Sequence, residues 1–145
     1  MLGIHNRGVP ISKRLKFFIK NLTEIDVPMG SLDITFHRDD FRERLTMPEI
    51  KSTDINFNLD EKIVVLVDDV LFSGRTVRAA LEEINSFGRP SIVALAVLID
   101  RGHRELPIRA DFVGKNIPTN DGEHVAVKLK ESDTDEGVFL IFGDE

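Results

Sequence analysis

The sequence predicts an α/β domain with a mainly parallel sheet, helices on both faces and an antiparallel tail. Two apolar runs support this prediction, because residues 63–67 and 92–99 are rich in aliphatic, often β-branched, side chains and lack polar alternation. Such runs are typical of strands buried on both faces, as in parallel sheets. Between them, one apolar face recurs at helical spacing, formed by Val77, Ala80, Leu81 and Ile84.

Length and composition fit a single domain that spans residues 1–145. Of the 145 residues, 41% are hydrophobic and 30% are charged, which is ordinary for a globular protein. The longest apolar run is too short to span a bilayer, no signal peptide is visible, and there is no Cys, which together favour the cytoplasm. The net charge of −6 argues against general charge-driven binding of nucleic acid but leaves room for a local basic face.

The first buried run is predicted to end at Asp68 and Asp69, before a small polar loop and the helix. The carboxyl edge of a parallel sheet faces a crevice, and a helix N-terminus offers unpaired N–H groups, so phosphate binds readily there. Gly74 lets the backbone approach an anion, while Ser73 and Thr76 add hydroxyl donors. The loop lacks the Lys of a nucleoside-triphosphate P-loop. The simpler interpretation is a tight turn with a capping Ser or Thr.

The segment from Val64 to Thr76, V-V-L-V-D-D-V-L-F-S-G-R-T, closely resembles the phosphoribosyl-pyrophosphate (PRPP) loop of type I phosphoribosyltransferases. The resemblance implies that Asp68 and Asp69 are catalytic and take the ribose hydroxyls. It also implies that Asp69 holds Mg²⁺ through bound PRPP or water. The residues implied to wrap the 5′-phosphate are Val70, Leu71, Phe72, Ser73, Gly74, Arg75 and Thr76.

The start of the chain predicts a short strand at residues 1–4, a loop at residues 5–8 and a helix that Pro10 opens. One face of this helix carries apolar side chains, namely Ile11, Leu15, Phe18, Ile19 and Leu22. The loop resembles the pyrophosphate loop of the same enzymes, although the two residues before its Arg-Gly pair differ from the usual pattern. The likeness implies that Asn6 and Arg7 bind PRPP, with Arg7 on its pyrophosphate. By themselves, these residues form only a turn.

Enzymes of this kind normally carry an N-terminal helix and a full first strand before the pyrophosphate loop, whereas four residues precede it here. That strand belongs in the middle of the sheet. A short strand without its covering helix is therefore expected to leave apolar surface and backbone groups unsatisfied. The residues leave open whether the sequence is truncated or the family function has decayed.

The next segment predicts a strand with one solvent-exposed face, because the apolar residues Leu32, Ile34 and Phe36 alternate with polar residues. The residues from Gly30 to Asp40, G-S-L-D-I-T-F-H-R-D-D, resemble the PyrR family of uracil phosphoribosyltransferases and pyrimidine-operon RNA attenuators. The likeness implies that Arg38 contacts pyrophosphate and that Asp39 and Asp40 position metal or substrate, all three as catalytic residues. The structural alternative is a charged strand end.

Residues 42–61 are polar and mixed, and they predict a long loop. Such loops often close over active sites. Phosphoribosyl transfer needs a lid, because the oxocarbenium-like centre that forms as pyrophosphate leaves must be kept from water. The alternative is a floppy surface excursion.

The segment from Asp100 to Thr119 agrees almost letter for letter with the PyrR signature. Its first residues, Asp100, Arg101 and Gly102, are predicted to lie at the same sheet edge as the phosphate loop and to form a uracil pocket from backbone donors and acceptors. The resemblance implies that a basic cluster recognises RNA, formed by His103, Arg104, Arg109 and Lys115. From charge alone, this cluster would be a solvated face.

The tail predicts a turn at residues 120–122, a strand at 125–129, an acidic turn at 131–137 and a last strand at 138–142. Taken together, the resemblance implies a glycosyltransferase that moves phosphoribosyl from PRPP to uracil, giving UMP and pyrophosphate with Mg²⁺. It also implies UMP-dependent binding of pyrimidine-operon mRNA, which is transcription attenuation, and a homo-oligomer, either dimer or tetramer. An RNA-binding attenuator with little or no catalysis stays open, and a purine-specific enzyme is the less favoured alternative.

Overall fold

The structure is a computed structural model and describes residues 1–38 and 52–143. Its strands are β1 (Leu2–Ile4), β2 (Gly30–Leu32), β3 (Ile63–Leu71), β4 (Ile92–Asp100), β5 (Phe112–Asn116), β6 (Glu123–Lys128) and β7 (Gly137–Phe142). Its helices are α1 (Gly8–Thr23), α2 (Arg75–Ile84) and the short 3₁₀ helix η1 (Thr35–His37).

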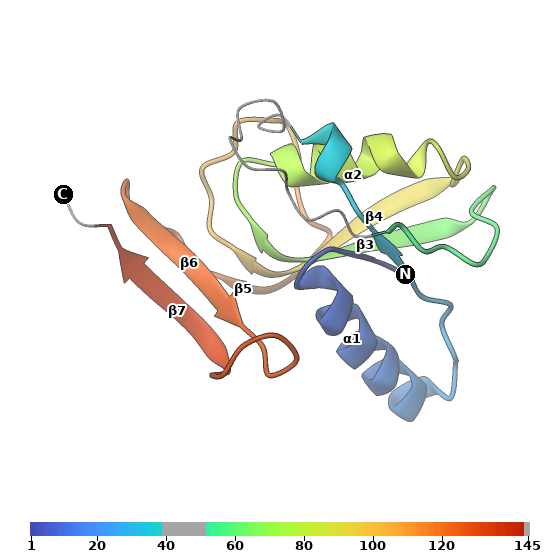
Figure 1. The fold of residues 1–145 in the computed structure, drawn as a ribbon, viewed down its shortest axis with the longest axis horizontal. Coiled ribbons are helices and arrows are strands. Elements are labelled where there is room, and N and C mark those ends of the chain that lie inside the picture. The colour runs from blue at the N-terminus through green and yellow to red at the C-terminus, as the bar shows by residue number, and fades with distance from the viewer. Residues whose placement is uncertain (39–51, 144–145) are drawn as a thin grey trace.

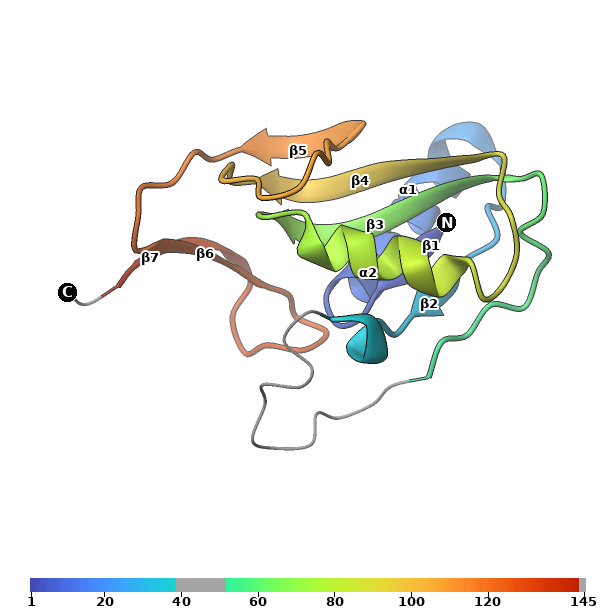
Figure 2. The same ribbon diagram turned by 90° about the horizontal axis from the view of Figure 1, so that it is seen from above.

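The first five strands form one parallel sheet in the order β2-β1-β3-β4-β5. Figure 1 shows α2 on one face of this sheet and α1 on the other. Strands β6 and β7 pair antiparallel in a separate hairpin, which lies beyond the carboxyl ends of β3 to β5 (Figures 1 and 2). This arrangement confirms the predicted α/β class, with its mainly parallel sheet and antiparallel tail.

The two central strands bring the predicted site segments to one edge. The β3–β4 ladder runs from the pair Ile63 and Ile92 to the pair Leu71 and Asp100. The phosphate loop and the segment that begins at Asp100 therefore leave the sheet side by side, as parallel connections require.

The strand β3 is longer than the sequence predicted. The prediction ended it at the two carboxylates, but the ladder continues through Asp68, which pairs with Val97, and on to Leu71. The long neighbour β4 explains the difference, because its backbone groups continue to pair with β3 beyond the apolar run.

The alternation after Gly30 gave a wrong strand boundary. Strand β2 ends at Leu32, and Ile34 is still buried, but Phe36 is exposed. The carboxylate of Asp33 accepts a hydrogen bond from the backbone N–H of Thr35 at 2.9 Å. This local Asp turn competes with extended backbone and starts η1 instead.

The predicted loop at residues 42–61 is only partly described. Residues 39–51 lie outside the described residues, so Asp39, Asp40 and the proposed lid have no structural account here. The following stretch is not a surface excursion, because Leu59 is fully buried and Ile55 and Phe57 pack against the core. Strand β5 was not predicted, since only Phe112 and Val113 mark it in a polar segment.

The two helices differ in how much apolar surface they bury. Helix α2 buries Val77, Ala79, Ala80 and Ile84. Helix α1 buries Ile11, whereas Phe18 is 56% exposed and Leu22 is 83% exposed, so its apolar face is not buried along its second half. Strand β1 offers too little sheet to cover that half, which projects past the sheet in Figure 1.

An apolar groove of about 210 Å³ lies between α1 and the sheet, with Ile11, Leu15, Val67, Leu98 and Phe112 in its lining. The described residues leave the apolar lining of this groove uncovered. No helix in the described part of the chain is long and apolar enough to cross a membrane.

Candidate active site

Two adjacent carboxylates stand at the carboxyl end of β3. The Asp68 side chain is buried, with the residue only 7% exposed, and it accepts a hydrogen bond from the backbone N–H of Asp69 at 2.9 Å. The Asp69 carboxylate in turn accepts one from Val70 N–H at 2.8 Å. Burial, together with the charge of Asp69, raises the pKa of Asp68 well above its usual value. The pair therefore favours hydroxyl donors or a cation beside it.

The loop between β3 and α2 leaves an anion site open at the N-terminus of α2. Gly74 is the N-cap, with a φ of +92°, and no side chain caps the helix. The Ser73 hydroxyl accepts a long hydrogen bond of 3.3 Å from Arg75 N–H. Within the described residues, the Thr76 hydroxyl has no hydrogen-bond partner. The free N–H groups, the helix dipole and this hydroxyl suit a phosphate.

The loop that follows β4 is hydrogen-bonded to this phosphate loop. The carbonyl of Ser73 accepts bonds from the N–H groups of Glu105 at 2.9 Å and Leu106 at 3.1 Å. The guanidinium of Arg104 donates to the Phe72 carbonyl at 2.9 Å and to the Asp100 carboxylate at 2.5 Å. Against the effect of burial, hydrogen bonds from Arg104 and from Gly102 N–H lower the pKa of Asp100.

The predicted uracil-pocket residues lie directly beside the phosphate loop. Arg101 is only 8% exposed, and its guanidinium lies 4.1 Å from the centre of the Phe72 ring. The same guanidinium donates to the Thr119 hydroxyl at 3.1 Å and to the Glu123 carbonyl at 2.6 Å. Gly102 N–H bonds the Asp100 carboxylate at 3.0 Å. The side chain of Phe72 stays half-exposed next to this rigid arginine.

The predicted pyrophosphate loop is packed closely against the centre of the sheet. A Cβ atom at Gly8 would lie 2.3 Å from the carbonyl oxygen of Val67, so only glycine fits there. Arg7 directly precedes this position, and the His5–Asn6 peptide bond is cis. The loop thus reaches the sheet next to the strand that carries Asp68 and Asp69.

An acidic turn between β6 and β7 holds this loop through ion pairs that the sequence did not reveal. Arg7 donates two hydrogen bonds to Asp133, at 2.9 and 3.4 Å. Arg14 donates to Glu131 at 2.8 and 2.6 Å and to Glu136 at 2.5 Å. Arg7 is the main reason that the pKa of Asp133 falls to about 2. The run of acidic residues at 131–137 was the only signal, and it did not name a partner.

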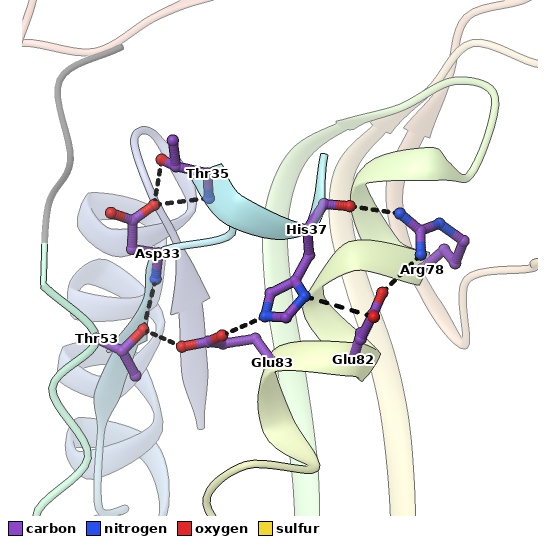
Figure 3. Close-up of polar contacts among 7 residues, drawn as sticks. All are labelled: Asp33, Thr35, His37, Thr53, Arg78, Glu82 and Glu83. Carbon is purple, nitrogen blue, oxygen red and sulfur yellow. Dashed lines mark hydrogen bonds and ion pairs between the residues drawn. The ribbon is translucent and has the colours of Figure 1, made fainter. Parts of the chain in front are cut away.

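A polar network ties the segment before Arg38 to α2 (Figure 3). The His37 ring nitrogen Nε2 lies 2.7 Å from a Glu83 carboxylate oxygen, and the His37 carbonyl accepts a hydrogen bond from Arg78. Thr53 donates to the other Glu83 oxygen at 2.9 Å and accepts from Asp33 N–H at 3.0 Å. His37, the residue directly before Arg38, is therefore fixed to α2, the helix that follows the phosphate loop.

The four predicted RNA-binding residues fall into two groups. Arg109 and Lys115 are exposed and, among the described residues, have no hydrogen-bond or ion-pair partner. His103 is exposed, and its Nε2 atom lies 2.5 Å from the Thr119 carbonyl. Arg104 is half-buried, and hydrogen bonds within the protein engage its guanidinium.

The described residues contain no group of three or more His, Cys, Asp or Glu side chains arranged to hold a metal ion. Asp68 and Asp69 still fit Mg²⁺, because this ion is usually held by one or two carboxylates together with substrate phosphates. The raised pKa of Asp68 supports the fit, since a nearby cation would relieve the same unfavourable charge.

Comparison with known proteins shows the family to which the chain belongs. The phosphoribosyl transferase domain family matches residues 1–132. The chain is 54% identical over 141 residues to the bifunctional protein PyrR of Pelotomaculum thermopropionicum, an alignment that covers 97% of this chain and 78% of that protein. It is 49% identical over 145 residues to the bifunctional protein PyrR of Enterococcus faecalis, which covers 100% of this chain and 81% of that protein.

Two solved structures share the fold at low sequence identity. The hypoxanthine phosphoribosyltransferase of Trypanosoma cruzi superposes with a TM-score of 0.70 at 15% identity, over 99% of this chain and 75% of that one. A purine phosphoribosyltransferase from Pyrococcus horikoshii gives a TM-score of 0.57 at 23% identity, over 79% and 68%. Fold, loop geometry and sequence similarity agree, and the chain belongs to the PyrR family of phosphoribosyl transferase domains.

Proposed function

We propose that this chain transfers the phosphoribosyl group of PRPP to N1 of uracil, forming UMP and pyrophosphate. The observation that supports it most directly is the adjacency of an open phosphate loop, a carboxylate pair and the Asp100–Gly102 segment at one sheet edge. Each piece matches one part of the substrates: the 5′-phosphate, the ribose hydroxyls and the base. Family membership supports the same assignment.

The chemistry asks the protein mainly for positioning and charge stabilisation. In the proposed reaction the N1–C1′ bond forms as the C1′–oxygen bond to pyrophosphate breaks, and uracil releases its N1 proton to solvent. The free N–H groups of α2 and the Thr76 hydroxyl bind the 5′-phosphate, and Asp68 and Asp69 accept hydrogen bonds from the ribose hydroxyls. Arg7 and Arg38 bind the leaving pyrophosphate and stabilise its developing charge.

Uracil is proposed to lie against the exposed side of Phe72. Its two carbonyls and N–H groups need fixed partners. Arg101 N–H already bonds the Leu71 carbonyl and Gly102 N–H already bonds the Asp100 carboxylate, so in this proposal Gly102 N–H exchanges its carboxylate partner for a uracil carbonyl. Mg²⁺ is proposed to bind at Asp69 through water or PRPP, where it supplies charge neutralisation to the diphosphate.

We propose UMP-dependent binding of pyrimidine-operon mRNA as the second activity. Its support is two exposed cations, Arg109 and Lys115, with the exposed ring of His103, in a chain whose net charge is −6. Exposed cations without protein partners are suited to RNA phosphates. The same proposal includes a cytoplasmic location, because its substrates and the mRNA are cytoplasmic molecules.

Turnover tests the first activity. UMP formation from uracil, PRPP and Mg²⁺ is expected for the wild-type chain, and Asp69→Asn should lower it by about two orders of magnitude or more, because it removes a charged acceptor from the site. Hypoxanthine serves as the competing base. Turnover of hypoxanthine without uracil would instead support a purine-specific enzyme. A folded chain that binds RNA but turns over neither base would support the attenuator without catalysis.

Charge reversal tests the second activity. Arg109→Glu is expected to abolish binding of the pyrimidine-operon leader RNA while UMP synthesis continues, because Arg109 makes no contact with the catalytic residues among the described part of the chain. Equal loss of both activities would show general damage to the fold. RNA affinity should also fall steeply between low and moderate salt if phosphate contacts dominate.

Self-association is proposed for the exposed apolar surface of α1, where Phe17, Phe18 and Leu22 face solvent. Light scattering should give a mass of two or four chains. A Leu22→Lys variant should shift that mass toward one chain, and a single-chain mass in the wild type would refute the proposal.

A further inference from the structure

Arg104 differs from the other cations of the predicted RNA-binding group. Its guanidinium donates to three acceptors that belong to three different parts of the site: the Phe72 carbonyl at 2.9 Å, the Asp100 carboxylate at 2.5 Å and the Ile108 carbonyl at 2.8 Å. Arg109 and Lys115 have no such partners among the described residues. A guanidinium with this many protein acceptors has few donors left for an RNA phosphate.

The three acceptors connect the nucleotide site to the RNA-binding surface. Phe72 belongs to the phosphate loop, Asp100 to the predicted uracil pocket, and Ile108 directly precedes Arg109. Arg104 therefore joins both halves of the nucleotide site to Ile108, the residue directly before the exposed Arg109. The planar guanidinium makes this possible, because its donors point in several fixed directions.

Backbone contacts reinforce the same connection. The carbonyl of Ser73 accepts hydrogen bonds from Glu105 and Leu106, and the Leu71 carbonyl accepts one from Arg101 N–H at 3.0 Å. A Cβ atom at Gly74 would lie 3.2 Å from the Cβ atom of Ile108, so the two loops also touch by packing. Residues 104–108, here called the coupling segment, therefore lie directly on the phosphate loop.

We propose that Arg104 is the positioning residue that couples nucleotide occupancy to RNA binding, rather than a direct RNA contact. This inference rests on the proposed function. Binding of UMP fixes the phosphate loop around its 5′-phosphate, and Arg104 transmits that order to Ile108 and hence to Arg109. An ordered Arg109 pays less conformational entropy when it meets an RNA phosphate, so RNA binds more tightly to the UMP-bound protein.

The test compares RNA affinity with and without UMP in matched variants at one fixed salt concentration, using the pyrimidine-operon leader transcript. Coupling of this kind typically changes affinity about 5- to 150-fold. The wild-type ratio should lie in that range. Arg104→Lys keeps the positive charge but cannot reach three separated acceptors, so its ratio should fall toward one. Lys115→Ala, the matched control, should lose affinity in both states and keep the wild-type ratio, because Lys115 lies on β5, outside the coupling segment. Arg109→Ala should lower the ratio as Arg104→Lys does, because it removes the side chain that UMP is proposed to order.

The outcomes separate the coupling from the function on which it rests. No RNA binding by the wild-type chain would refute the proposed RNA activity. RNA binding without any UMP effect, or an Arg104→Lys ratio equal to that of the wild type, would refute the coupling alone. Equal loss of affinity with and without UMP in Arg104→Lys would make Arg104 a direct RNA contact.

A second measurement needs no substitution. Hydrogen exchange of the wild-type protein should show that UMP slows exchange of the amides of Glu105 and Leu106, which bond the phosphate loop, in the absence of RNA. By linkage, RNA must tighten UMP binding by the same factor that UMP tightens RNA binding. Unchanged exchange in the coupling segment on addition of UMP would overturn the proposal.

Discussion

The two loops that are proposed to hold the two ends of PRPP are built by different forces. The phosphate loop between β3 and α2 is held by backbone hydrogen bonds from Arg101, Glu105 and Leu106 and by packing against the core. The pyrophosphate loop between β1 and α1 also packs against the sheet at Gly8, but it is joined to the hairpin by the ion pair of Arg7 with Asp133, beside the ion pairs that Arg14 of α1 makes with Glu131 and Glu136. The first should tolerate salt and acid, and the second should respond to both.

The difference also bears on how each loop meets its ligand. The Thr76 hydroxyl has no hydrogen-bond partner among the described residues, and Arg75 N–H makes a long bond of 3.3 Å to the Ser73 hydroxyl, so phosphate binding is expected to displace little at this loop. Arg7 is already paired with Asp133. If Arg7 binds pyrophosphate as proposed, the pyrophosphate shares Arg7 with Asp133 or replaces Asp133, and we expect this half of the site to adjust on binding.

The largest expected effect comes from crowding the phosphate loop. Gly74→Ala places a Cβ at a φ of +92° and 3.2 Å from Ile108, so the loop must shift away from the geometry that binds phosphate. PRPP affinity should fall at least tenfold. Gly122→Ala is the control, because it carries the same kind of strain, about 1–2 kcal/mol, at a φ of +82° with nothing within 4 Å. If both variants keep the wild-type affinity, the crowding argument is wrong.

The next largest effect should be a rise in the stability of the fold when the buried Asp68 is replaced by Asn. Because the pKa of Asp68 is raised in the folded protein, ionisation costs stability, which falls as the pH rises from the unfolded value of about 4 through the raised value. Asp68→Asn keeps the hydrogen-bond acceptor and removes that cost. Its thermal midpoint at neutral pH should rise by several degrees, since about 1 kcal/mol gives roughly 2–8 °C, while turnover is lost. A lower midpoint in calorimetry would count against the burial argument.

The smallest effect should come from Asp133→Asn, which is expected to change the stability of the fold only at acid pH. Arg7 lowers the pKa of Asp133 to about 2, so the ion pair stabilises the fold fully above the unfolded value of about 4, and this contribution disappears as the pH falls toward 2. Asp133→Asn should therefore show a shallower loss of stability than the wild type between pH 4 and pH 2. Parallel acid-unfolding curves followed by circular dichroism would show that this ion pair does not hold the hairpin.

Local patterns in the sequence predicted the parts of the fold that depend on burial alone. The apolar runs of β3 and β4, the buried face of α2 and the alternation of β6 are all repeated signals with a single structural solution. The prediction failed where a partner or a turn decided the outcome. Strand β3 continues through Asp68 because β4 pairs with it, and β2 stops because Asp33 bonds its own neighbour.

In the candidate site, too, local sequence patterns predicted some residues, whereas contacts between residues distant in sequence were not predicted. The proposed phosphate-loop residues are contiguous in sequence, so a motif was enough to predict them. Asp133 and Glu83 lie far along the chain from Arg7 and His37, and only the folded arrangement brings each pair together. The role proposed for Arg104 depends on its hydrogen bonds to the Phe72 carbonyl, the Ile108 carbonyl and the Asp100 carboxylate. A pattern of charges in the sequence does not reveal these partners.

The most direct test of the central claim is calorimetric titration of PRPP with Mg²⁺ into the wild type, Thr76→Ala and Thr76→Ser. A hydrogen bond to a charged group contributes about 1.5–3 kcal/mol, so Thr76→Ala should bind PRPP roughly ten- to hundredfold more weakly. Thr76→Ser keeps the hydroxyl and should bind as the wild type does. Equal affinity for all three proteins would contradict the claim that this loop holds the 5′-phosphate.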